Sequence, residues 1–429
     1  MQPPFSLLKV IGFYGRMSLY ERGADMKYDF TSMLNRRGMD SIAVDAVYGS
    51  DGSHAPRAPK GDFDVIPMWV ADMSFKTAPC VVDAIKKRLE HHIFGYLSPY
   101  DCYYDAIINW QRVRNGVDYI EKSHIGYLNG VLGGVVAAAN VFTSEGGSIL
   151  LHSPTYIGFK HSLADNGYNL VYSALVPDEN GIFRMDFEDM ERKIVENKIR
   201  TAVFCSPHNP SGRVWESWEV EKAMELFRKH DVFVISDEIW ADFVLYNNHH
   251  VPTQSVSEDA KMRTVALYAP SKTFNLAGLV GSYSVILSPD IKNRFDKELS
   301  RAHLNNINVL SMHALLGAYT NDGQEWVDEL REVLEGNIDF ATDYITKRFD
   351  GVAFSKPQGT YMLFVDCTKW CEKHNKTIED VLNSAWDVGV AVQNGSGFGG
   401  TCHVRMNLAL PLEKLKEAFD RLDRYVFNA

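Results

Sequence analysis

A lysine, an aspartate and an asparagine each follow a short apolar run that we predict to be a strand: Lys272, Asp237 and Asn209. Parallel sheets bind ligands at the carboxyl ends of their strands, so these three side chains are expected to share one site. The lysine amine can form a Schiff base with a carbonyl group. Taken alone, each residue has a simpler explanation: a surface lysine, a helix cap, and a turn between two prolines. Their occurrence together at strand ends favours a catalytic site over these simpler explanations.

Amine, acid and amide together are the set that pyridoxal 5'-phosphate (PLP) uses. Its aldehyde would form a Schiff base with Lys272. Its pyridine nitrogen needs a carboxylate such as Asp237 to stay protonated. The ring hydroxyl needs a donor such as the Asn209 amide. The three residues therefore predict a PLP site at the edge of the sheet.

A phosphate group needs backbone N–H groups at a helix N-terminus. Residues 129–134 are glycine-rich and open a predicted helix, where the amides of Val131 and Leu132 would be available. Such a start is by itself more often an ordinary helix start, and Ser271 offers a hydroxyl to the same group. Tyr156, at the start of another predicted helix, is positioned either to stack on a cofactor ring or to pack in the core.

Arg405 lies within an apolar strand pattern, after a glycine-rich turn at residues 395–400. An unpaired charge there would be costly, so the guanidinium needs a partner. A substrate carboxylate, held by the two-pronged guanidinium, is one candidate. An internal salt bridge is the alternative.

The elements that position these residues alternate between helix and strand. Apolar runs of four to eight residues suit a mainly parallel sheet covered on both faces. We predict strands at 148–152, 169–174, 201–205, 232–236, 264–268 and 282–287, and helices at 77–90, 101–114, 130–142, 156–166, 186–197 and 217–230. Long helices follow at 291–349, and then a mixed segment with strands at 361–366 and 403–408 and helices at 377–388 and 412–427. The fold class is therefore α/β, with a smaller α+β domain.

Length and composition exclude several classes of protein. The chain has 429 residues, 45% of them hydrophobic and 23% charged, which is typical of a globular protein with a large core. The net charge of −11 argues against a nucleic-acid partner. The longest nearly apolar stretch, 130–142, is too short to span a membrane, and residues 5–13 do not read as a signal peptide.

The six cysteines do not form a disulfide framework in so long a chain, and they indicate a cytoplasmic protein. Cys367, Cys371 and His374 are close in sequence, as metal ligands often are. No second Cys/His cluster at metal spacing accompanies them, so we interpret them as helix-packing residues and expect no metal.

The motifs then resemble those of a known family. Together they are similar to fold-type I PLP enzymes of the aminotransferase class I/II superfamily, over nearly the whole chain from residue 27. The segments that carry the resemblance are Ser-Pro-His-Asn-Pro-Ser-Gly (206–212), Ser-Asp-Glu-Ile (236–239) and Ser-Lys-Thr-Phe-Asn-Leu-Ala-Gly-Leu (271–279). Segments 35–41, 67–73, 94–96 and 213–215 look most like the branch of cystathionine β-lyases and C–S lyases of the MalY/PatB type.

The resemblance implies an architecture. It implies a large PLP-binding domain, residues 76–316, with a mainly parallel, mixed seven-stranded sheet. It also implies a small domain made of residues 27–75 and 317–429. Residues 1–26 would be an N-terminal extension that is not part of either domain.

The resemblance also implies a role for each site residue. Lys272 would hold PLP and move the α-proton, Asp237 would pair with the ring nitrogen, Asn209 with the ring hydroxyl, and Tyr156 would stack on the ring. Val131, Leu132 and Ser271 would bind the phosphate, and Tyr96 would reach the phosphate of a neighbouring subunit in a homodimer. Arg405 would hold the substrate carboxylate, with the backbone of Val70 and Ala71 lining the same pocket.

Four positions depart from the family pattern: Ser74 stands where the family usually has Asp, Gly133 where it often has Pro, and Val280 and Trp240 bear on the cofactor. Val280 stands where many aminotransferases have an arginine that contacts the phosphate, so that group has one charged partner fewer. Trp240 stands where many relatives carry Tyr or His, which puts a ring-hydroxyl contact from this position in doubt, although an indole N–H can donate.

Three functions are compatible with these residues. The first is a PLP-dependent β-lyase that acts on L-cystathionine or related S-substituted cysteines. The second is an aminotransferase with the same cofactor, because both reactions begin with cleavage of the Cα–H bond. The third is a regulatory protein on the same scaffold.

Overall fold

The computed structural model describes residues 26–49 and 55–429. Its larger sheet has eight strands in the order β2-β9-β8-β7-β6-β3-β4-β5. These strands are β2 (Ile125–Asn129), β3 (Ser148–Ser153), β4 (Asn169–Pro177), β5 (Phe183–Met185), β6 (Thr201–Cys205), β7 (Phe233–Asp237), β8 (Thr264–Tyr268) and β9 (Gly281–Val285). The pairs from β8 through β4 are parallel, and the pairs β2–β9, β9–β8 and β4–β5 are antiparallel.

The expected mixed, mainly parallel sheet is therefore confirmed, with eight strands where we expected seven. β5 is a three-residue strand at the sheet edge. β2, which the sequence pattern did not reveal, contains Gly126 and ends at Asn129, two residue types that are depleted in strands. Its hydrogen bonds to β9 supply what its local propensity lacks.

The large sheet is covered on both faces, which explains why its strands are continuously apolar. Val203 of β6 packs in a cluster with residues of α5 (Val131–Phe142), α6 (Ile157–Asp165) and α11 (Pro289–Arg301). Its neighbours Ala202 and Phe204 pack on the opposite face with α7 (Phe187–Glu196) and α8 (Ser217–Lys229). Successive side chains of a strand point to opposite faces, so two covered faces require an uninterrupted apolar run.

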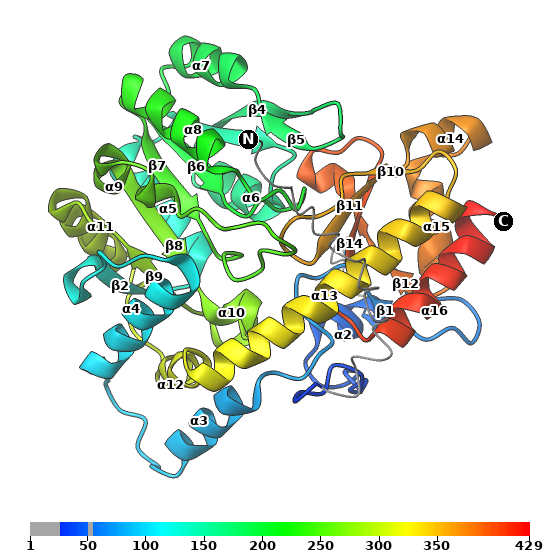
Figure 1. Cartoon of the computed structure of the whole chain (residues 1–429), viewed down its shortest axis with the longest axis horizontal. Coiled ribbons are helices and arrows are strands. Elements are labelled where there is room, and N and C mark those ends of the chain that lie inside the picture. Colours follow the sequence, from blue (N-terminus) through cyan, green and yellow to red (C-terminus); the bar gives the residue numbers. More distant parts are fainter. Residues whose placement is uncertain (1–25, 50–54) are drawn as a thin grey trace, which may run out of the picture.

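A second, smaller sheet is antiparallel, with the order β10-β11-β14-β13. Its strands are β10 (Ala353–Phe354), β11 (Met362–Asp366), β13 (Gln393–Asn394) and β14 (His403–Asn407). The surrounding helices are α14 (Thr368–His374), α15 (Ile378–Asp387) and α16 (Leu412–Leu422), which continues through a π-helical turn to Phe427. The long helix α13 (Asn321–Arg348) crosses the molecule beside this region (Figure 1).

The segment before residue 75 joins the C-terminal part of the chain. β1 (Ile66–Pro67) pairs in parallel with β12 (Val390–Ala391). This contact agrees with the predicted assignment of residues 27–75 to the small domain, and the boundaries of the two domains stay a prediction.

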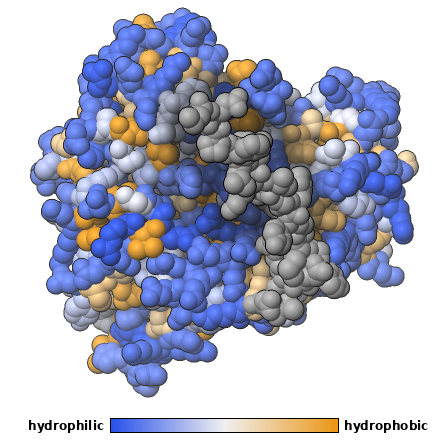
Figure 2. Space-filling view, in the orientation of Figure 1, coloured by the Kyte–Doolittle hydropathy of each residue, from blue (hydrophilic) through white to orange (hydrophobic). Residues whose placement is uncertain are grey.

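Six further α-helices lie in the described ranges, and the first of them packs with Trp69 and with Ala391 of β12. They are α2 (Ile42–Tyr48), α3 (Pro79–Leu89), α4 (Asp101–Asn115), α9 (Glu258–Arg263), α10 (Pro270–Thr273) and α12 (Val309–Ala318). The helical stretch expected at 291–349 is thus divided into α11, α12 and α13. The face in Figure 2 is mostly hydrophilic, and no helix in the described ranges is long and apolar enough to cross a membrane.

Candidate active site

The ends of three neighbouring strands meet at a cavity of about 200 Å³. Asp237, the last residue of β7, lies between Cys205 of β6 and Leu267 of β8 in the sheet register. Of the predicted site residues, the cavity is lined by Lys272, Asp237, Asn209, Tyr156, Val131, Leu132, Ser271 and Ala71. The sheet therefore brings together side chains that come from distant parts of the sequence.

Lys272 lies in the short helix α10, which begins with Pro270 directly after β8. A proline at the first helical position fixes the start of a helix. The Nζ atom donates a hydrogen bond to the carbonyl oxygen of Ala71, 3.0 Å away. Burial, followed by the positive charge of Arg405, lowers the pKa of Lys272 to about 8. An amine with such a pKa can give up its proton near neutral pH.

Asp237 is buried, with 4% of its surface exposed. Burial raises the pKa of its carboxyl group to about 7, although the backbone N–H of Ile239, 3.1 Å from Oδ1, and the charge of Lys272 act in the opposite direction. A cationic ligand placed next to this carboxylate would lower its pKa again. The site therefore offers a buried carboxylate that gains from a cationic partner.

The N-terminus of α5 faces the same cavity. Gly130, just before the helix, has φ +82°, a conformation that favours glycine. No side chain caps this end of the helix, and no acidic residue lies in its first turn. The first amides of a twelve-residue helix are thus left for another acceptor, which is the usual arrangement for binding an anion.

Arg405 lies in the middle of β14 and is 3% exposed. Its Nη1 donates to Oδ1 of Asn209 at 3.2 Å, and Nη2 donates to the carbonyl of Trp69 at 2.9 Å and to Oε1 of Gln393 at 2.5 Å. Its Nε is buried without a partner among the described residues. Burial lowers the pKa of this guanidinium to about 10. All its partners are neutral, so the internal salt bridge considered from the sequence is not what the described residues form.

Three predicted residues lie outside the cavity lining: Arg405, which contacts the lining residue Asn209, and also Val70 and Tyr96. Val70 accepts a hydrogen bond at its carbonyl from Nδ2 of Asn407, 2.7 Å away, next to Ala71. Tyr96 is fully exposed in a segment without regular secondary structure, and it does not reach the cavity of its own chain.

Trp240 lines the cavity, and Tyr361, to which the sequence analysis gave no role, packs against it. The ring of Trp240 is 5.8 Å from Nζ of Lys272, and its edge packs on Tyr361 at 4.7 Å between ring centroids. The hydroxyl of Tyr361 donates to the same Ala71 carbonyl as Lys272, at 3.1 Å. Tyr361 precedes an apolar strand and looks like a core residue in the sequence, so no local signal could have identified it. Val280 lines the wall, so no cation stands at that position.

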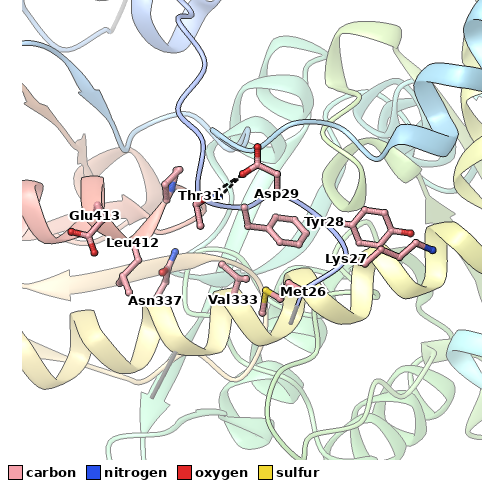
Figure 3. Close-up of a pocket in the computed structure, with 11 residues that line it drawn as sticks. Met26, Lys27, Tyr28, Asp29, Thr31, Val333, Asn337, Leu412 and Glu413 are labelled. Carbon is pink, nitrogen blue, oxygen red and sulfur yellow. Dashed lines mark hydrogen bonds between the residues drawn. The ribbon is translucent and has the colours of Figure 1, made fainter. Parts of the chain in front are cut away.

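A larger cavity, of about 540 Å³, lies in another part of the molecule (Figure 3). It lies between residues 26–31, α13 and the start of α16, and its lining includes Met26, Phe30, Val333 and Leu412. Lys27 at its rim is paired with Asp322 and Glu325. No predicted site residue lines this cavity.

The cysteine-rich segment is packed as a structural unit. The ring of His374 stacks on Trp370 at 4.5 Å and its Nδ1 lies 2.9 Å from the Trp370 carbonyl. Cys371 lies beside Cys402 instead, with 3.5 Å between the sulfur atoms. Among residues 26–49 and 55–429, no three His, Cys, Asp or Glu side chains converge as metal ligands.

Comparison with known proteins places the chain in a family. Residues 64–422 match the model of the aminotransferase class I and II family, and the chain belongs to this family. It is 32% identical to the cystathionine β-lyase PatB of Bacillus subtilis over 364 residues, which are 84% of this chain and 92% of that protein.

Two solved structures superpose on the chain with a TM-score of 0.85 each. One, from Clostridium difficile 630, is a PLP-bound protein described provisionally as an aminotransferase; it is 34% identical and covers 92% of this chain and 99% of its own. The other is cystalysin from Treponema denticola, which contains PLP; it is 28% identical and covers 93% of this chain and 98% of its own. The expected fold-type I architecture is confirmed.

Proposed function

We propose that this protein is a PLP-dependent β-lyase that cleaves the Cβ–S bond of L-cystathionine or a related S-substituted cysteine, giving a thiol, pyruvate and ammonia. One observation carries the proposal. A lysine with a lowered pKa and a buried carboxylate meet at the strand ends of a chain in this family, and a buried arginine without an anionic partner contacts Asn209 beside them. The name of the relative from Bacillus subtilis supports the choice of substrate.

The residues of the cavity fit PLP. The uncapped N-terminus of α5, with the amides of Val131 and Leu132, and the Ser271 hydroxyl would hold the phosphate. Asp237 would pair with the ring nitrogen and Asn209 with the ring hydroxyl. When bound, PLP supplies a protonated ring that stabilises negative charge at the substrate Cα.

Each remaining residue of the site has a task toward the substrate. Lys272 takes the proton from Cα, for which a pKa near 8 suits it. Arg405 holds the substrate carboxylate, because its Nε has no partner and the charge it carries is uncompensated. The carbonyl of Ala71 orients Nζ of Lys272, and Tyr156, which lines the cavity, would stack on the cofactor ring. The backbone of Val70 supports this wall through its bond to Asn407.

The functional unit in this proposal is a homodimer in the cytoplasm. Residues 91–100 expose several large apolar side chains, among them Ile93, Phe94, Tyr96 and Tyr100. An exposed group of this kind is expected to be covered by a partner. Tyr96 would reach the phosphate bound by a second copy of the chain. The six unpaired cysteines agree with a reducing compartment.

The test is the release of products from L-cystathionine by the purified, PLP-loaded protein, with no keto acid added. Continuing release of pyruvate and thiol in equal amounts would support the β-lyase. Lys272→Ala should abolish turnover, whereas Lys87→Ala, which changes an exposed lysine on α3, should leave it unchanged. Pyruvate release at the wild-type rate by Lys272→Ala would contradict the assignment.

An aminotransferase is the second candidate, favoured by the description of the Clostridium difficile structure. The same residues would hold the cofactor and the substrate. Turnover that depends on an added keto acid, with no release of thiol, would decide for this alternative.

A further inference from the structure

Residues 69–73 (the bridging segment) contribute Ala71 to the lining of the active-site cavity. All five residues are described, and none of them lies in a helix or a strand. Every one of their carbonyl oxygens nevertheless accepts a hydrogen bond from a side chain elsewhere in the protein. The position of this cavity wall therefore depends on side chains rather than on regular backbone pairing.

The two cations of the site are held by alternate carbonyls of the bridging segment. Nη2 of Arg405 donates to the carbonyl of Trp69 at 2.9 Å, and Nζ of Lys272 donates to the carbonyl of Ala71 at 3.0 Å. A carbonyl is a neutral acceptor, so it orients a cation and leaves the positive charge available to a ligand. Where these carbonyls lie thus decides where the amine and the guanidinium point.

The carbonyls between these two are held by Asn407. Its Nδ2 donates to the carbonyls of Val70 at 2.7 Å and of Asp72 at 2.5 Å, and its Oδ1 accepts from the backbone N–H of Ala409 at 2.7 Å. Asn407 is 3% exposed and follows Arg405 by two residues on β14, so both side chains lie on one face of that strand. The strand that carries the arginine also holds the segment on which the arginine is oriented.

The end of the bridging segment is held by Asn275. Its Oδ1 accepts from the backbone N–H of Met73 and its Nδ2 donates to the Met73 carbonyl, each at 2.9 Å. Asn275 follows Lys272 by three residues within the motif 271–279, and its backbone has φ +59°, which Asn tolerates better than most residues. The loop that carries the lysine is thus joined to the segment that accepts its hydrogen bond.

We propose that Asn275 and Asn407 are positioning residues, which fix the bridging segment so that its carbonyls orient the lysine and the arginine of the site. Neither amide is among the residues that line the cavity, so both act through the backbone that they hold. The inference rests on the proposed function, in which Lys272 takes the Cα proton and Arg405 holds the substrate carboxylate.

The sharpest test is Asn275→Gly, because glycine adopts a φ near +59° without strain and only the amide is lost. In the PLP-loaded enzyme, kcat with L-cystathionine should fall by about 10- to 100-fold, because Lys272 loses its fixed acceptor. KM should stay within about threefold of wild type, because Arg405 keeps its contacts. A protein that is only less stable would not separate kcat from KM in this way.

Two further variants examine the hydrogen bonds themselves. Asn275→Asp keeps an acceptor for the Met73 N–H but turns a second oxygen toward the Met73 carbonyl, so it should not restore kcat. Asn407→Ala frees the carbonyls on both sides of Ala71, so it should lower kcat and raise KM, each by about 10-fold or more.

The double variant, Asn275→Gly with Asn407→Ala, should lose less kcat/KM than the product of the two single losses, because both amides hold the same segment. The matched control is Asn140→Ala on α5. The Asn140 amide also bonds in both directions, accepting from the Tyr168 hydroxyl and donating to Glu298, each at 2.6 Å, but it does not touch the bridging segment. Its kcat and KM should stay within about twofold of wild type.

The outcomes are distinct. A wild-type kcat in Asn275→Gly, or single losses that multiply in the double variant, would overturn the inference. Loss of bound PLP from Asn275→Gly, measured by absorbance, would also overturn it, because the amide would then support the fold of the site. If Asn407→Ala does not fold, Asn275→Gly decides alone. A wild-type protein that binds PLP but neither releases thiol nor transfers amino groups would instead refute the proposed function.

Discussion

Two buried arginines in this molecule have very different partners. Arg213, after the loop that carries Asn209, is 2% exposed at its side chain and contacts the carboxylates of Glu216 and Glu219. Its Nε also donates to the Phe183 carbonyl at 3.1 Å. Arg405 is as deeply buried, yet its partners are neutral and its Nε has none. The difference separates a charge that supports the fold from one that is kept for a ligand.

The largest expected effect comes from replacing Arg213, the arginine that supports the fold. Arg213→Ala leaves the fully buried Glu219 without its main partner, so the free energy of unfolding should fall by about 3–5 kcal/mol. Urea denaturation measures this. Arg192→Ala, which removes an exposed arginine that pairs with Asp189 and Glu196 on α7, is the control and should cost less than about 1 kcal/mol. An Arg213→Ala protein as stable as this control would show that the two arginines do not differ.

Replacing Arg405 should have the opposite effect: it should lower activity and leave stability intact. Arg405→Ala should lower kcat/KM by about 100- to 1000-fold, mainly through KM, because the substrate carboxylate loses its partner. Stability should be unchanged or higher, because a desolvated charge is removed. Arg405→Lys keeps the charge but not the two-pronged donor and should recover only part of the loss. Loss of stability with an unchanged KM would assign Arg405 to the fold.

The smallest expected effect concerns Asp237 and the pH dependence of stability, measured in the cofactor-free protein. The pKa of Asp237 is about 7 in the folded protein and near its ordinary value of 3.8 when unfolded. Between these values the folded state binds a proton that the unfolded state does not, so stability falls as pH rises from about 4 to 7. Asp237→Asn should lack this fall, leaving it more stable at pH 8 by roughly 1–4 kcal/mol. Parallel stability profiles of the two proteins would contradict the raised pKa.

Sequence reasoning located the strand ends well, for a physical reason. Strands buried on both faces are continuously apolar, so the polar residues that end them stand out, as Asn209, Asp237 and Lys272 do. β2 was missed because its five residues, Ile-Gly-Tyr-Leu-Asn, include Gly and Asn, so the strand depends on its partner β9 rather than on local propensity.

The parts of the site that escaped depend on contacts between distant residues. Tyr361 and Lys272 share the carbonyl of Ala71, and no spacing in the sequence links these three positions. The hydrogen bonds of Asn275 and Asn407 to the bridging segment depend on how distant parts of the chain pack. For Arg405 the sequence indicated a buried charge that needed a partner, and only the structure showed that the described residues supply no carboxylate. The roles assigned to the site residues, those of Val70 and Tyr96 included, stay predictions.

The bond between Lys272 and Ala71 has a consequence for how the site is assembled. Ala71 belongs to a segment anchored through β1 on β12, whereas Lys272 follows β8 of the other sheet. One wall of the cavity is thus contributed by each of two regions that are far apart along the chain. A cofactor that touches both walls can be retained only after both have folded and docked. Retention of the coenzyme therefore serves as a reporter of completed maturation, and its early loss on mild heating would mark separation of the two regions before either one melts.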